Sequence, residues 1–188
     1  MFSIAWGEET MRKIVIAFVA ACALVGCSPV LEPPPPPPPT VEETPSGPTF
    51  TEKEQAYVDA VHAYLDVHTR IMHDPPNEDW EAIREVTWPP LEDKALMQFL
   101  TWAESGFHLE GAPLFTADEV RWSSLDSQGE WYFVYGCYDI TEAITFDGEG
   151  KQLENPRGDL HYAKFEVLQT PEGRFYVASG VALEDETC

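Results

Sequence analysis

Apolar residues return with a helical period in the first part of the folded region. Between Thr51 and Asp74 they recur every three or four positions, which places them on one face of an amphipathic helix. Thr51 and Glu54 have the spacing of a capping box, which satisfies free backbone amides at a helix start. Pro75 cannot continue the helix, so we predict a helix over 51–74. Its apolar face comprises Tyr57, Val61, Tyr64, Leu65, His68, Ile71 and Met72.

Two more helices are predicted downstream. A short one covers residues 78–86 and is broken by Pro89 and Pro90. The next begins at Leu91 and ends near Gly106, again with apolar residues at steps of three and four. The first half of the domain is therefore expected to be helical.

In the second half the period changes to two, which predicts strands. Alternating or aromatic-rich segments lie near residues 120–122, 131–137, 162–167 and 175–177. The segments between them include three glycine-bearing turns of the kind that tight reversals require, at 126–129, 147–150 and 170–173. Strands joined in this way pair antiparallel. Helices followed by such strands predict an α+β fold, in which a curved antiparallel sheet wraps around the long helix.

A leader precedes this domain. Residues 14–25 form a short apolar run behind Arg12 and Lys13, the arrangement of a bacterial signal peptide. The run is shorter than the roughly 20 residues that a transmembrane helix needs. Acidic residues upstream of the basic pair are unfavourable in a signal peptide, so we expect translation to start at Met11. The signal peptide is therefore assigned to residues 1–26, with its true start expected at Met11.

The leader is followed by Cys27, and the segment Leu24-Val25-Gly26-Cys27 resembles the lipobox of bacterial lipoproteins. In that family the cysteine thiol takes diacylglycerol, and a peptidase then cuts the chain before it. The resemblance implies that Cys27 is the lipidation site and holds the protein on the extracytoplasmic face of the cell membrane. The alternative is an ordinary secretory leader in which Cys27 is incidental.

Residues 27–49 are predicted to be a disordered, proline-rich spacer. Pro33 to Pro39 are consecutive prolines, and in polyproline II geometry they make a semi-rigid rod of roughly 22 Å. Such a rod would lift the domain away from the lipid surface. A docking site for a proline-binding domain is the alternative. What remains, residues 50–188, has the size of a single domain.

The chain is strongly acidic, with 11 Lys and Arg against 33 Asp and Glu and a formal charge of −22. This balance argues against nucleic acid as a partner. It would also repel anionic lipid headgroups, so any membrane attachment has to come from something other than surface electrostatics, and a covalent lipid anchor would supply it.

The order of the predicted elements resembles that of the nuclear transport factor 2-like superfamily, which includes ketosteroid isomerase and the polyketide cyclases. A local pattern is similar to that of uncharacterised lipoproteins of high-GC Gram-positive (actinobacterial) bacteria. It consists of Gly136-Cys137-Tyr138-Asp139, the turn at 147–150 and the terminal Cys188. The resemblance covers residues 50–188 and implies a cone, with helices packed on a curved sheet. Relatives often dimerise through the open sheet face, so a homodimer is one arrangement that it allows.

After export, Cys137 and Cys188 are an even pair of thiols in an oxidising compartment. We predict a disulfide between them, which ties the chain end to a central strand. Two free thiols are the alternative.

Enzymes of the superfamily place an Asp, His or Tyr in the mouth of the cone as a base. His62 and Asp66 are four residues apart on the predicted long helix and share a face, so they could form a catalytic His-Asp pair. A solvent-facing surface pair is the alternative. We expect Asp139 to accept a hydrogen bond from a backbone amide or an arginine. The full set of residues considered as a base is Asp59, His62, Asp66, His73, His108 and Asp139.

No metal and no cofactor are expected. His62, His68 and His73 do not share one helical face, and no zinc spacing or nucleotide-binding fingerprint is present. The aromatic residues pack the core, or some of them line a cavity for an apolar ligand.

The function predicted from these features is that of a non-catalytic envelope lipoprotein whose domain binds a protein or a small apolar ligand. An isomerase- or dehydratase-like enzyme and a purely structural envelope component are the alternatives. The interior of the cone distinguishes them, because an enzyme needs an acid or base in an open pocket.

Overall fold

The computed structural model describes residues 48–153, 160–184 and 186–188. They belong to one compact unit, Glu43–Cys188. The predicted signal peptide (1–26), the lipidation site Cys27 and the spacer as far as residue 47 lie outside the described residues. These parts of the account remain predictions.

The long helix is α1 (Glu52–His73), and its start confirms the predicted capping box. The amide of Glu54 donates to the Thr51 hydroxyl (3.3 Å), and the Thr51 amide donates to the Glu54 carboxylate (2.8 Å). The apolar face predicted for this helix is buried, with His68 only half-buried. The helical period therefore identified the inward face correctly.

The second helix is short, as predicted over 78–86. It is a 3-10 helix, η1 (Trp80–Glu85). Asp79 caps it by accepting a hydrogen bond from the amide of Glu81 (3.0 Å). Six residues are too few for a stable α-helical run, and the tighter 3-10 turn is common in such short pieces. Helix α2 (Leu91–Ser105) follows and ends at Gly106, whose φ of 69° is the left-handed cap typical of glycine.

The strands form two sheets. Strands β2 (Leu114–Leu125), β3 (Glu130–Asp139), β5 (Leu160–Gln169) and β6 (Phe175–Ala182) make an antiparallel sheet in the order β2-β3-β5-β6. The predicted turns at 126–129 and 170–173 join β2 to β3 and β5 to β6. The short strands β1 (His108–Glu110) and β4 (Ile144–Phe146), which the sequence did not predict, pair antiparallel as a second sheet.

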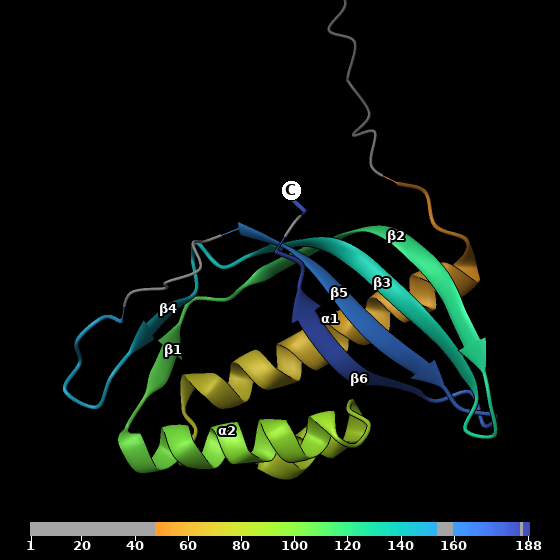
Figure 1. Cartoon of the computed structure of the whole chain (residues 1–188). Helices are drawn as coiled ribbons and strands as arrows, with labels where there is room; N and C mark the ends of the chain where they lie inside the picture. Colours follow the sequence, from red (N-terminus) through yellow and green to blue (C-terminus); the bar gives the residue numbers. More distant parts are fainter. Residues whose placement is uncertain (1–47, 154–159, 185) are drawn as a thin grey trace, which may run out of the picture. The chain divides into compact units, whose positions relative to one another are not determined.

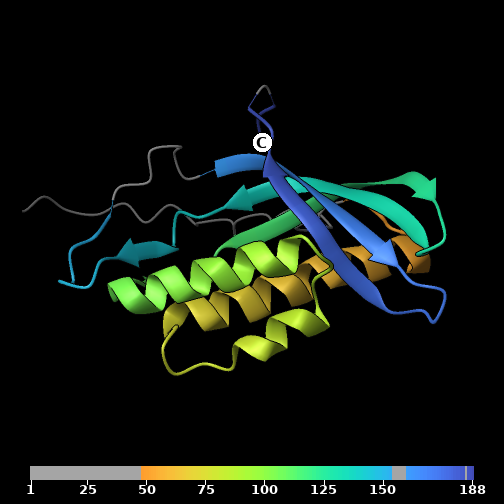
Figure 2. The ribbon, with the colours of Figure 1, turned by 60° about the horizontal axis from the view of Figure 1, so that its bottom comes forward.

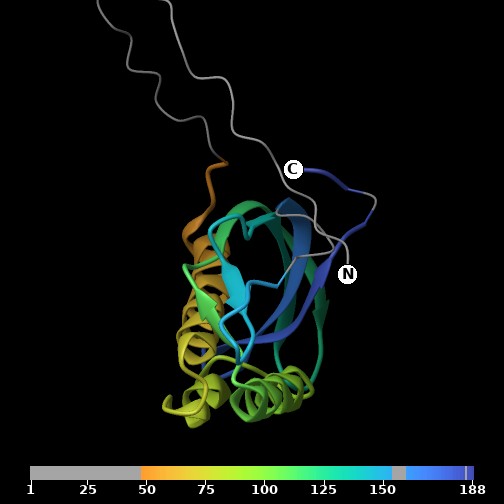
Figure 3. The same ribbon diagram turned by 90° about the vertical axis from the view of Figure 1, so that its left-hand side faces the viewer.

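The four-stranded sheet is curved, and α1 lies in its hollow (Figure 1). Helix α2 runs beside α1 at the open side of the hollow, with η1 on the other side of α1 (Figure 2). Strands β1 and β4 stand at one end of the domain (Figure 3). This is the α+β cone that the sequence predicted. Its core joins α1, η1, α2 and the inward face of the sheet through Tyr57, Val61, Ile71, Ile83, Phe99, Val134, Val167 and Val177.

The predicted disulfide is present between Cys137 and Cys188. The two Cα atoms are 5.5 Å apart, and the bond joins residues separated by 51 positions. It fastens the end of the chain to β3, one of the two central strands of the sheet.

Across residues 48–153, 160–184 and 186–188, no helix is long and apolar enough to cross a membrane.

Candidate functional site

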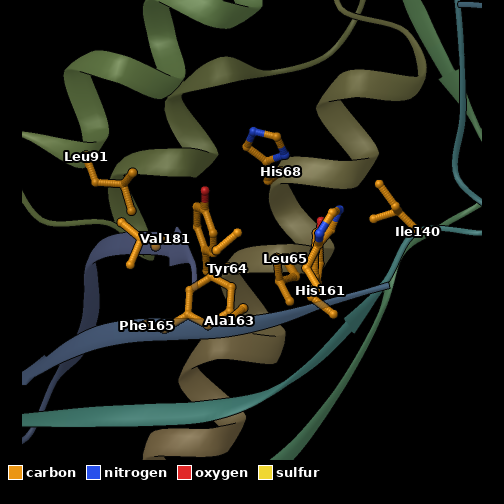
Figure 4. A pocket seen from close by; sticks show the side chains of 12 residues that line it. Tyr64, Leu65, His68, Leu91, Ile140, His161, Ala163, Phe165 and Val181 are labelled. Atoms are coloured by element: carbon orange, nitrogen blue, oxygen red, sulfur yellow. The ribbon is translucent and has the colours of Figure 1, made fainter. Parts of the chain in front are cut away.

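A pocket of about 330 Å³ opens between the end of α1, the start of α2 and the inward face of the sheet. Its volume lies at the low end of the range of small-molecule sites, about 300–1,000 Å³. Figure 4 shows the side chains converging from these elements on the space. The lining residues are Tyr64, Leu65, His68, Leu91, Tyr138, Ile140, His161, Ala163, Phe165, Gly180, Val181 and Ala182.

Strand pairing brings the sheet side of the pocket together. Tyr138 on β3 lies opposite His161 on β5, so both side chains point to the inward face. Ala163 and Phe165 follow on the same face of β5, because alternate residues of a strand share a face. Phe165 is buried and forms part of the pocket wall.

Gly180 on β6 makes room for the Phe165 ring. A Cβ atom at residue 180 would lie 2.8 Å from Cε1 of Phe165, closer than carbon atoms approach. A side chain at residue 180 would therefore force the Phe165 ring to move.

His68 contributes an imidazole from α1. Its ring packs beside Tyr64 and Phe99, with centroid distances of 5.7 and 5.3 Å. Burial lowers the pKa of His68, and a long hydrogen bond to Gln98 (3.4 Å) opposes that effect only in part. The imidazole is therefore neutral at pH 7, with its Nε2–H donating to the amide oxygen of Gln98.

Tyr64 and Tyr138 contribute hydroxyl groups. Burial raises the pKa of Tyr64, and it raises the pKa of Tyr138 to about 12. Both side chains therefore stay protonated at any physiological pH and present an O–H donor.

His62 and Asp66, the predicted catalytic pair, do not line this pocket. Both are exposed on α1, and no hydrogen bond joins them within the described part of the chain. His62 donates instead to the carbonyl oxygen of Phe115 (3.2 Å). The hypothesis of a cavity acid and base made by these two residues gains no support from this geometry.

The other residues considered as a base also lie outside the pocket. Asp59 is exposed and accepts from Gln55 (2.8 Å), and His73 donates to the carbonyl oxygen of Gly111 (2.6 Å). His108 stacks on Phe146 at 5.4 Å. Asp139 accepts from the amide of Thr141 (2.9 Å), as predicted for a backbone partner, and hydrogen bonds with that residue lower its pKa.

Sequence reasoning missed two functional candidates, Tyr138 and His161. The alternation of β5 carries a usable signal, because His161 has the same parity as the buried Ala163 and Phe165. Tyr64 and His68 were already part of the predicted apolar face, and the structure places both in the pocket. Among the described residues, no group of three or more His, Cys, Asp and Glu side chains is arranged to hold a metal ion.

The pocket and the cone together define a class: an α+β domain with an apolar cavity under a curved sheet. No family model matches the sequence, and no curated protein matches it. Solved structures do resemble it. The intermembrane-space region of the chloroplast protein ARC6 has a TM-score of 0.54 at 15% identity, over 72% of this chain and 98% of that one. At this identity the similarity establishes the fold alone.

Two further structures are similar at lower scores. A ketosteroid isomerase-like protein from Erwinia carotovora has a TM-score of 0.47 at 17% identity, over 70% of this chain and 95% of that one. A protein from Catenulispora acidiphila, solved in complex with S-DNPA, has a TM-score of 0.38 at 11% identity, over 68% and 92% of the two chains.

Proposed function

We propose that this protein is a lipid-anchored, extracytoplasmic binding protein whose pocket holds a small apolar ligand without changing it chemically. The location rests on the apolar leader and the Leu24-Val25-Gly26-Cys27 sequence. The binding role rests on the pocket, and the one observation that carries it is the composition of the pocket lining.

Eight of the twelve lining residues are aliphatic, phenylalanine or glycine, and the other four are Tyr64, His68, Tyr138 and His161. None is Asp, Glu, Lys or Arg, although such residues make up 23% of the chain. An apolar wall with a few convergent polar groups is the usual make-up of a small-molecule site. A cone filled by its own side chains, as a purely structural component would have, does not leave this space.

One observation favours a second candidate, an isomerase- or dehydratase-like enzyme. His68 lies in the pocket as a neutral imidazole, and a neutral imidazole can accept a proton from a bound substrate. The pocket offers no carboxylate to work beside it, so the binding role is the better supported. If the native protein converted a bound ligand chemically and the His68→Gln variant did not, the result would favour the enzyme instead.

Filling the pocket tests the binding role. Val181 is 45% exposed at the pocket rim, so Val181→Trp adds bulk there without enlarging the packed core. We expect it to reduce binding of the bicyclic hydrocarbon tetralin at least tenfold, as measured by ligand-observed NMR on the mature chain carrying Cys27→Ser. Leu114→Trp is the matched control, because Leu114 is 63% exposed on β2 and outside the pocket. Equal loss in both variants, or no binding by the native pocket, would reject the proposal.

The anchor is tested separately. Cys27→Ala removes the thiol that would carry the lipid. In a Triton X-114 partition the variant should therefore be found in the aqueous phase and not in the detergent phase, and its electrophoretic mobility should differ from that of the native protein. Globomycin, which blocks the lipoprotein peptidase, should make the uncut precursor accumulate. Unchanged partitioning and mobility after both treatments would show that Cys27 bears no lipid.

A further inference from the structure

We propose that a groove along the outer side of α1 binds a positively charged amphipathic helix of another protein. The groove is separate from the pocket under the sheet, because the two have no lining residue in common. The proposal therefore goes beyond the proposed function and can be tested independently of it.

Helix α1 carries a second apolar stripe besides the face that packs in the core. Four small apolar residues follow one another at steps of four, three and four positions, the spacing of a coiled-coil seam. None of them belongs to the buried face of α1. A helix that packs one face on a core is normally polar on its other side, so this stripe indicates a second packing partner. The four residues are Ala56, Ala60, Ala63 and Val67.

Two adjoining hollows follow this stripe and form the groove. The first, of about 340 Å³, is lined by the three alanines, and the second, of about 520 Å³, is lined by Val67. Val86 lines both hollows, and Phe175 at the start of β6 lines the first. Helix η1, which lies beside α1, contributes to the wall of the second (Figure 2). Because alanine side chains are short, the backbone of a docked helix can approach α1 closely.

The rim of the groove is acidic. Five carboxylates line it and only one cationic side chain, that of Arg70, which pairs with Glu78 (Nε to Oε2, 3.5 Å). Asp59 and Glu85 are exposed, and neither forms a salt bridge with a residue that the structure describes. A partner that covers the groove therefore needs positive charges beside its apolar side chains. The five carboxylates are those of Asp59, Glu78, Asp79, Glu81 and Glu85.

This charge argues against the chain itself as the occupant. Residues 28–47, outside the described ranges, contain Glu32, Glu42 and Glu43 and no lysine or arginine. A second copy that docked through the same groove would bring its own carboxylates against these.

The complementary occupant is a helix of another protein with lysine or arginine on both sides of an apolar stripe. A helix can follow the stripe of α1 along its whole length, as in other helix-in-groove complexes. From Ala56 to Val67 the stripe is about 17 Å long, which about three turns of the partner helix would cover.

Two synthetic peptides test the charge of the partner. Both are amphipathic helices of about 14 residues with alanine and leucine on one face, and the polar face carries lysine in one peptide and glutamate in the other. Binding of each labelled peptide to the mature chain carrying Cys27→Ser is measured by fluorescence anisotropy. We expect the lysine peptide to bind and the glutamate peptide to bind at least tenfold more weakly. Added salt should weaken binding of the lysine peptide, because salt screens exposed charges.

A bulky substitution tests the place of binding. Ala63 is exposed, so Ala63→Phe puts a ring into the groove without enlarging the packed core. Thr101→Phe is the matched control, because Thr101 is exposed on α2 and outside the groove. Only Ala63→Phe should weaken binding of the lysine peptide, by roughly fivefold or more.

Charge removal tests the rim without changing any packed residue. Asp59→Asn together with Glu85→Gln should weaken binding of the lysine peptide about threefold to tenfold, the range that two exposed ion pairs supply. Glu104→Gln together with Glu149→Gln removes the same charge at exposed positions outside the groove and should leave binding nearly unchanged.

Four outcomes would overturn the proposal. The lysine peptide does not bind, or the glutamate peptide binds as tightly. The control variants lose as much binding as the groove variants, which would mean that the peptide binds the acidic surface in general. Sedimentation finds a dimer of the native chain that Ala63→Phe dissociates, which would assign the groove to a second copy.

Discussion

Single side chains set the chemistry of the pocket. His68, Tyr64 and Tyr138 are polar groups held in an apolar wall, and burial shifts the pKa of each in the direction that favours its uncharged form. Burial costs these groups part of their hydration by water. Because they carry no charge, the lining suits the small apolar ligand that we propose.

His68 also makes stability depend on pH. Its pKa is lower in the folded protein than the ordinary value of 6.5, because burial disfavours the imidazolium. The unfolded chain therefore binds a proton first as the pH falls. The stabilising contribution of the neutral ring is complete above pH 6.5 and is lost as the pH falls through the folded-state pKa.

We predict that His68→Phe removes this pH dependence. Phenylalanine keeps the ring contacts with Tyr64 and Phe99 but cannot take a proton. We measure the free energy of unfolding in urea at several pH values between 7.5 and 5. As the pH falls, the native protein should lose more of this free energy than the variant does. A constant difference in unfolding free energy over that range would mean that His68 is not buried as described.

Among the elements, α1 is the one that the sequence encodes most fully. Its capping box fixes the start, and its period identified the inward face, including the three residues that line the pocket, Tyr64, Leu65 and His68. The sequence predicted a short helix where η1 lies but not its type, and the 3-10 form is common in short helices. Strands β1 and β4 have three residues each, too few for a period of two to be recognised.

The capping box of α1 can be tested directly. Thr51→Ala removes the hydroxyl that accepts from the Glu54 amide, and it should lower the free energy of unfolding by about 1 kcal/mol. Thr101→Ala is the matched control, since Thr101 lies exposed in the interior of α2 and bonds only to the Met97 carbonyl oxygen. It should change stability little, because alanine favours a helix interior. Equal effects in both variants would speak against the cap.

In the whole molecule, the pocket depends on contacts between distant parts of the chain. The pairing of Tyr138 with His161 brings β3 and β5 together, and the end of β6 completes the wall. The sequence predicted the inward face of α1, but which strand residues meet across the pocket depends on this long-range pairing, which no local pattern specifies. His62 and Asp66 were chosen as neighbours on one helix, and the packing of that helix leaves both exposed.

The disulfide acts on the same scale. It closes a loop of 51 residues, and in the chain-entropy model a loop of this length restricts the unfolded chain by about 4 kcal/mol. Replacing both Cys137 and Cys188 with serine should lower the free energy of unfolding by an amount approaching that figure. Reductant should destabilise the native protein to a similar extent and leave the double variant unaffected. A native protein whose stability does not respond to reductant would contradict a stabilising role.

The binding of an apolar ligand in the cone is the central claim, and crystallography tests it most directly. A crystal of the mature chain carrying Cys27→Ser, soaked with tetralin, should show the bicyclic body in the pocket against Phe165. A pocket that holds only ordered water, with tetralin absent or bound elsewhere on the domain, would contradict the account.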